Sequence, residues 1–309
     1  VTLVPGDTPL LPWAQAHDAA HEAAEGHDAA LQHALEVKAP YLNVTFFVVR
    51  TLVFFLIWIA AAAFFVRTSL KQDDGQAGPE ASAKMKTISA PFIIVFAFTV
   101  TFASFDWLMS LEPAWFSTIF GVYVWSGMTV ASLAAITIAV VALRAKGWIP
   151  EGLVTRDHLY SLGGLLFAFT CFWAYIAFSQ YMLIWYGNIP EETFWFADRL
   201  ENGWMTVSLA LAALRFVIPF FLLLSRGSKM DPRRLTQVSV LILVGQLVDL
   251  YWLIMPQAYE GAPRLGWQEL GPTLLLTGIL LVLVARFLGR QRLVAVGDPL
   301  LERSRNFHL

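Results

Sequence analysis

Polar side chains that could line a path for protons lie within, or close to the ends of, long stretches of sequence that are otherwise apolar. They are Asp106, Glu112, His158, Tyr175, Gln180, Arg215, Gln246 and Asp249. Because a charged or strongly polar group is costly inside a bilayer, each such group is by default a functional hypothesis. Together they could line a wet path for protons, in which Asp249, the deepest carboxylate, is the strongest candidate. Glu112 and His158 also have structural interpretations. Glu112 would lie at the membrane interface, and His158 would cap a helix at the inner surface.

A structural interpretation competes with the proton path. An arginine side chain reaches several ångström along a helix. Arg215 and Asp249 could therefore form a buried ion pair if their two spans, which a short connection joins, are neighbours. In this interpretation Arg50 and Asp106 only touch the outer headgroup layer. The residues alone leave both interpretations open.

Seven apolar stretches must position these side chains. They cover about residues 41–66, 88–109, 119–143, 159–183, 204–225, 236–256 and 268–288. Each is close to the ~20 residues that a helix needs to cross a hydrocarbon core. The sequence therefore predicts an all-α polytopic membrane protein, with a transmembrane domain over 41–288 between a first segment, 1–40, and a tail, 289–309.

Lysine and arginine residues fall on alternate loops of this arrangement. The basic segments are 67–87, 144–158, 226–235 and the tail after residue 288. The opposite set of loops contains only Lys38, Arg199 and Arg264. Since basic loops stay on the cytoplasmic side, we expect a cytoplasmic C-terminus and an external, periplasmic segment 1–40.

The start of the chain raises an expectation about what precedes it. The sequence begins with Val1, and no charged region followed by an apolar signal core occurs there. A cleaved signal peptide or an odd number of earlier helices would place 1–40 outside. Because this segment has the character of a loop between spans, we expect earlier helices.

Composition restricts the chemistry that the chain can perform alone. It is 57% hydrophobic with 24 Phe and 12 Trp, which suits lipid contact and helix packing. Its net charge of −2 gives no indication of nucleic acid. The single cysteine, Cys171, cannot form a disulfide, an iron–sulfur cluster or a thiolate zinc site. No histidine lies deep in a span, so a bis-histidine haem between these helices is excluded.

The first segment contains a loose repeat of histidines in an alanine-rich context that favours helix. The histidines are His17, His21, His27 and His33. His17 and His21 would share one helix face. With Asp18, Glu22 or Asp28 they could bind a surface metal, but no known ligand pattern is matched, and a solvated surface helix is the favoured interpretation.

Three further features are interpreted as structural. Pro219 should kink the fifth span, and Gly163-Gly164 should allow a close helix approach. Aromatic residues cluster beside the acidic loop 184–203, either as an interfacial belt or as a docking surface for a peripheral partner. They are Trp185, Tyr186, Phe194, Trp195, Phe196 and Trp204.

Five stretches carry a resemblance to a known family. They are Ser104–Tyr123, Trp125–Gly127, His158–Gly163, Phe172–Glu192 and Asp249–Trp252. These long and unusual phrases resemble the integral membrane subunits of alternative complex III, and most of all its F subunit. That subunit is a relative of the polysulfide-reductase membrane-anchor (NrfD-like) family. The likeness covers most of residues 41–290.

The resemblance implies a quinol-oxidising complex of the bacterial inner membrane. Haem c and iron–sulfur subunits would carry electrons to a periplasmic acceptor, beside a homologous C-type membrane subunit. It also implies about ten helices in two four-helix bundles, so three would precede the seven seen here, in agreement with the charge pattern. In this family the quinol site is expected in the C subunit, and the F subunit is a cofactor-free scaffold with suggested proton-conducting residues.

Three functions are consistent with these observations. The favoured one is a scaffold subunit that conducts protons through Asp106, Arg215 and Asp249. The second is a subunit with its own quinol pocket near the outer face, where Asp106, Tyr123 or Tyr175 would bond the ring. The third is a free-standing transporter, which should show paired interrupted helices in two halves, whereas only Pro219 suggests an interruption.

Overall fold

The computed structural model describes residues 11, 13–14, 27–259 and 261–308 of the chain. All regular structure in these residues is helical, and seven helical spans are long and apolar enough to cross a membrane. They are α3 (Val44–Asp73), α4 (Glu80–Trp107), α5 (Phe120–Ala145), α6 (Arg156–Gly187), α8 (Trp204–Ala212) with α9 (Ile218–Leu223), α11 (Pro232–Ala258) and α12 (Trp267–Leu288). Each predicted span falls on one of them, so the predicted all-α polytopic membrane fold is confirmed.

Short helices flank or connect these spans. They are α2 (His27–Lys38), the 3-10 turn η1 (Met109–Leu111), α7 (Pro190–Ala197), α10 (Arg226–Met230) and α13 (Leu301–Arg305). The helix predicted for the histidine-rich segment is present over α2. His17 and His21 lie outside the described residues, and within the described ones no three His, Cys, Asp or Glu side chains form a candidate metal site.

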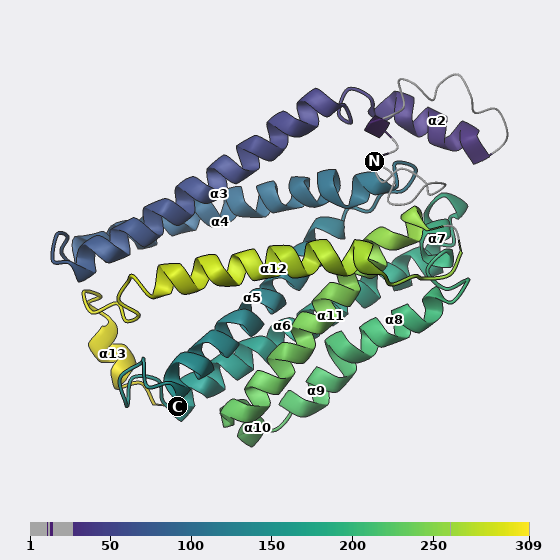
Figure 1. The fold of residues 1–309 in the computed structure, drawn as a ribbon. Helices are drawn as coiled ribbons and strands as arrows, with labels where there is room; N and C mark the ends of the chain where they lie inside the picture. The colour runs from purple at the N-terminus through teal and green to yellow at the C-terminus, as the bar shows by residue number, and fades with distance from the viewer. Residues whose placement is uncertain (1–10, 12, 15–26, 260, 309) are drawn as a thin grey trace.

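Four spans form one bundle: α5, α6, α11 and the broken span α8–α9 (Figure 1). Buried aliphatic side chains such as Leu159, Leu166, Leu235 and Ile242 fill its interior. Helix α7 covers one end and α10 the other. Near α10 the helices approach closely, because a Cβ on Gly163 would lie only 2.9 Å from the Lys229 Cβ. The predicted role of Gly163 is confirmed, whereas Gly164 has no atom of another element near it.

Two parts of the structure stand apart from the bundle. Helices α3 and α4 pair with each other and join the bundle through packing of α4 on α5 (Figure 1). Helix α12 has no buried residue. The tail is tied to α3, where Gly297 N donates to Asp73 Oδ1 at 2.8 Å.

The fifth span changes its helix type next to Pro219, where a kink was predicted. Proline cannot donate the backbone hydrogen bond that continues an α-helix. The chain adopts a π-helical turn, η2 (Ala213–Val217), just before it, and α9 then starts at Ile218. Such single π turns are frequent at functional sites. This one contains Arg215.

Candidate functional site

Asp249 is the centre of a polar cluster in the middle of the bundle. Its side chain is 2% exposed, and its Oδ2 lies 3.3 Å from Arg215 Nη1. The hydroxyl of Tyr123, on α5, donates a hydrogen bond to Asp249 Oδ1. Gln246, one turn earlier on α11, accepts a hydrogen bond from Arg215 Nη1. The predicted pairing of Arg215 with Asp249 is therefore confirmed.

Two glycines and a tryptophan make room for the Arg215 side chain. A Cβ on Gly245 would lie 2.9 Å from Arg215 Cγ, and one on Gly127 would lie 3.2 Å from Arg215 Nη2. The guanidinium also stacks 4.3 Å from the ring centre of Trp173. The Arg215 guanidinium thus extends from the π turn into a narrow space between α5, α6 and α11. Side chains larger than glycine at positions 127 and 245 would fill this space.

This cluster is incompletely hydrogen-bonded. Arg215 Nε and Nη2 and Trp173 Nε1 are buried and have no acceptor in the described part of the chain. A buried donor without an acceptor costs about 1–3 kcal/mol, and such groups are commonly met by ordered water. The cluster therefore combines a carboxylate, a hydroxyl and spare donors in a form that suits water-mediated proton exchange.

Asp106 lies in a different and fully bonded pair. Arg50 Nε and Nη2 donate to its two carboxylate oxygens at 2.8 and 2.9 Å, a bidentate arrangement. Arg50 Nη1 donates to the Tyr41 carbonyl, and its guanidinium lies 3.8 Å from the Tyr41 ring centre. The expectation that Arg50 and Asp106 only touch headgroups is wrong, since both are buried and they bind each other.

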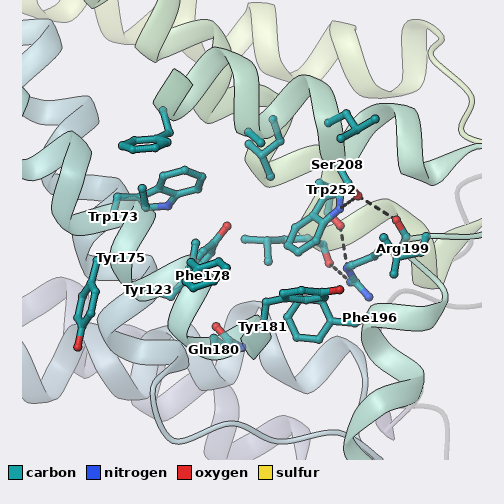
Figure 2. A pocket seen from close by; sticks show the side chains of 18 of the residues that line it. Tyr123, Trp173, Tyr175, Phe178, Gln180, Tyr181, Phe196, Arg199, Ser208 and Trp252 are labelled. Atoms are coloured by element: carbon teal, nitrogen blue, oxygen red, sulfur yellow. Dashed lines mark hydrogen bonds between the residues drawn. The ribbon is translucent and has the colours of Figure 1, made fainter. Parts of the chain in front are cut away.

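A cavity of about 650 Å³ adjoins the Asp249 cluster at the α7 end (Figure 2). Helices α5, α6, α7, α8 and α11 contribute its walls. Tyr123, Tyr175 and Gln180 line it, so three residues singled out in the sequence meet here. Figure 2 shows Tyr123 and Gln180 on one side of the cavity and Arg199 and Trp252 on the other.

Arg199 is a buried cation that the sequence does not single out. Its Nε, Nη1 and Nη2 donate to the carbonyls of Trp252, Trp195 and Leu253, and the guanidinium lies 3.4 Å from the Trp195 ring centre. Burial lowers the pKa of Arg199 to about 9, while the charges of Asp198 and Glu112 act in the opposite direction. The group therefore stays cationic at neutral pH and closes the α7 end of the cavity.

The aromatic loop beside α7 divides into two groups. Trp195 is 4% and Trp204 2% exposed, and Trp195 stacks on Trp115 with ring centres 4.3 Å apart. For these two residues the interpretation as an interfacial belt is wrong, because they pack inside the protein. Trp185 and Tyr186 are largely exposed, as expected of a belt.

The remaining candidates lie apart from the cluster. Glu112 ends η1 at the α7 end and is half-buried. His158 lies at the opposite end, where its Nδ1 accepts from the Thr155 N–H at 3.2 Å in a capping box. The predicted capping role of His158 is confirmed. Only Arg215, Gln246 and Asp249 of the predicted set form one cluster, and Tyr123 is the partner that joins it to the cavity.

Comparison with known proteins found no match, either to a family model or to a curated protein.

Proposed function

We propose that this chain is a cofactor-free integral subunit of a quinol:acceptor oxidoreductase of the alternative complex III type. It scaffolds the complex in a bacterial inner membrane, with its C-terminus cytoplasmic, and conducts protons coupled to quinol oxidation. Haem c, the iron–sulfur clusters and the homologous C-type membrane subunit belong to partner chains. The observation that carries the proton role is the incompletely bonded cluster of Tyr123, Arg215, Gln246 and Asp249.

The chemistry of the cluster supports proton transfer. Asp249 can accept and release a proton, and Tyr123 provides a hydroxyl that both donates and accepts. Arg215 Nη1 lies 3.3 Å from the Asp249 carboxylate and holds it in place. The spare N–H groups of Arg215 can hold the water that carries protons onward. A buried ion pair serving only stability would be expected to satisfy its donors, as the Arg50–Asp106 pair does.

The packing of the spans supports the scaffold role. Helix α12 is apolar between its two end turns and has no buried residue in the described chain. Membrane helices associate through close van der Waals packing, so a span without it in its own chain suits contact with helices of other subunits. Helix α3 likewise presents a largely exposed apolar surface, including Leu52, Leu56 and Ile59.

The decisive experiment replaces Asp249 by Asn in the whole complex reconstituted in vesicles. Electron transfer from quinol and coupled proton movement are measured together. We expect electron transfer to persist while coupled proton movement falls about a hundredfold, in the range of a lost general acid–base group. Asp74→Asn, an exposed change of the same type at the end of α3, serves as the control. Unchanged coupling in Asp249→Asn, or loss of assembly alone, would show that Asp249 is structural.

A further inference from the structure

A second, smaller pocket lies at the α10 end of the bundle, opposite the cavity beside Asp249. Its volume is about 300 Å³, at the lower end of the range for pockets that hold small molecules. It forms where α5 ends, where α6 and α11 begin, and where α10 packs on α6 and α11. Its lining residues are Val141, Arg144, Ala145, Arg156, Met230 and Pro232. Two cations therefore share a small space whose other lining residues are apolar.

The two arginines of this pocket have no anionic partner within the chain. Neither the Arg144 nor the Arg156 side chain forms a hydrogen bond or an ion pair with any residue that the structure describes. The carboxylates next to the lining residues in sequence have other partners. Asp157 Oδ2 lies 3.6 Å from His308 Nδ1. The side chain of Asp231 caps the start of α11 by accepting from a backbone N–H.

Basic side chains nearby on the same end of the bundle are satisfied within the protein. Lys229 Nζ donates to the Leu224 carbonyl at 3.3 Å. Arg234 Nη1 donates to Ser228 Oγ at 3.0 Å. These two side chains use the acceptors that the α10 end offers, whereas the guanidinium groups at the pocket keep all their donors available for a ligand.

The backbone adds positive potential to the pocket. Helix α6 begins at Arg156 and α11 begins at Pro232, and the start of a helix carries partial positive charge. The end of α5 carries the opposite sign and offsets one of these two starts. The two arginines also repel each other as like charges. An anion bound between them removes that repulsion and meets the helix starts.

A phosphate group fits this chemistry. A guanidinium offers paired N–H donors in a planar fork that binds two phosphate oxygens at once, and a phosphate has more oxygens to share between two arginines than a carboxylate has. The pocket lies at the ends of the membrane spans, where lipid headgroups lie. Basic pockets between spans are known to bind anionic headgroups, and the apolar lining suits the carbon atoms next to the phosphate.

We propose that this pocket binds a phosphate group between Arg144 and Arg156, and that the headgroup of an anionic phospholipid supplies it. Free inorganic phosphate carries the same chemistry, and the experiment separates the two sources. The inference rests on the pocket at the α10 end alone. It does not depend on proton conduction through Asp249 or on membership of an oxidoreductase complex.

The test measures thermal unfolding of the purified full chain in detergent, followed by tryptophan fluorescence. The probes are dioleoylphosphatidylglycerol, dioleoylphosphatidylcholine, which has the same acyl chains without the net charge, and sodium phosphate. We expect phosphatidylglycerol to raise the unfolding temperature saturably, and phosphatidylcholine to need about tenfold more lipid for the same rise. Protection by sodium phosphate without lipid would also support the pocket and would assign it to the free anion.

Variants at exposed positions locate the binding. Arg144→Gln with Arg156→Gln should weaken phosphatidylglycerol binding about tenfold or more, because hydrogen bonds to a charged group are lost. Arg233→Gln with Arg290→Gln removes two exposed cations that do not line the pocket and should change binding less than about twofold. Without lipid the two double variants should unfold at the same temperature. An equal loss of binding in both, full binding in the first, or equal protection by phosphatidylcholine would overturn the proposal.

Discussion

Two buried arginine–aspartate pairs occupy this chain, and they are built in opposite ways. In the pair between α3 and α4, each guanidinium nitrogen of Arg50 donates a hydrogen bond, and two of these bonds go to Asp106. In the pair between η2 and α11, Arg215 meets Asp249 through one nitrogen at 3.3 Å and leaves two others without acceptors in the described residues.

The surroundings of the two pairs also differ, although the buried Tyr41 hydroxyl beside Arg50 has no hydrogen-bond partner in the described residues. Arg50 is covered by the rings of Tyr41 and Phe46, at 3.8 and 4.1 Å from the ring centres, and Asp106 is fully buried. Asp249 is bonded to Tyr123, which lines a cavity that opens to the side of the bundle. The first pair joins α3 to α4 and is hereafter called the clasp. The second has donors without acceptors and is bonded to Tyr123 at the wall of a cavity, features that suit proton exchange through water.

The largest expected effect is the loss of the clasp. Arg50→Leu leaves Asp106 as a buried charge without its partner, which should lower the free energy of unfolding by about 3–5 kcal/mol. The free energy of unfolding is measured by titrating dodecyl sulfate into mixed micelles and recording circular dichroism at each step. Arg67→Leu, at an exposed position on the same helix, should change stability by less than about 0.5 kcal/mol. A similar small loss in Arg50→Leu would remove the distinction between the two pairs.

Neutralising both members of each pair sharpens the contrast. Arg215→Met with Asp249→Asn removes the two unpartnered donors of Arg215 and keeps an acceptor for Tyr123. It should leave stability unchanged or raise it by about 1–2 kcal/mol, as replacements of poorly compensated buried ion pairs do. Arg50→Met with Asp106→Asn gives up three well-formed hydrogen bonds and should lose about 2 kcal/mol. Changes of the same sign in the two double variants would show that the pairs are energetically alike.

The sequence predicts the spans well because their signal is local. Length and hydropathy suffice for each of the seven, and Pro219, which lacks a backbone N–H, marks the place where the fifth changes its helix type. The contact of Arg215 with Asp249 also follows from the sequence, since a short connection makes two antiparallel helices neighbours.

Other partners of the buried charges were not predicted. Arg50 and Asp106 also lie on consecutive spans, α3 and α4, but both fall near span ends where a charge can stay hydrated, so the sequence gives no reason to expect their bidentate contact. Tyr123 meets Asp249 from a helix far away in the chain, and Arg199 looks like an ordinary loop charge. Burial of Trp195 and Trp204 depends on how α7 folds back over the bundle, which hydropathy does not encode.

Removing the Tyr123 hydroxyl changes the surroundings of the Arg215–Asp249 pair less than the double substitution does. Tyr123→Phe takes away one donor to a carboxylate and should cost about 1.5 kcal/mol. It should also slow coupled proton movement in the reconstituted complex if the hydroxyl lies on the path. Tyr186→Phe, on a largely exposed side chain, should leave both unchanged. A stability loss in Tyr123→Phe with full proton coupling would restrict Tyr123 to holding Asp249 in place.

The smallest expected effect concerns a candidate that belongs to neither pair. His158 accepts from the Thr155 backbone at the start of α6, and its Nε2 lies 3.3 Å from Ser304 Oγ of the tail. His158→Ala should lose about 0.5–1 kcal/mol, the contribution of a helix cap. His158→Asn, which can still bond the cap, should recover part of it. Because His158 lies at the opposite end of the bundle from the cavity, proton coupling should persist in both variants. A loss of coupling in His158→Ala that Asn does not restore would place a proton entry at α6 and extend the path beyond the Asp249 cluster.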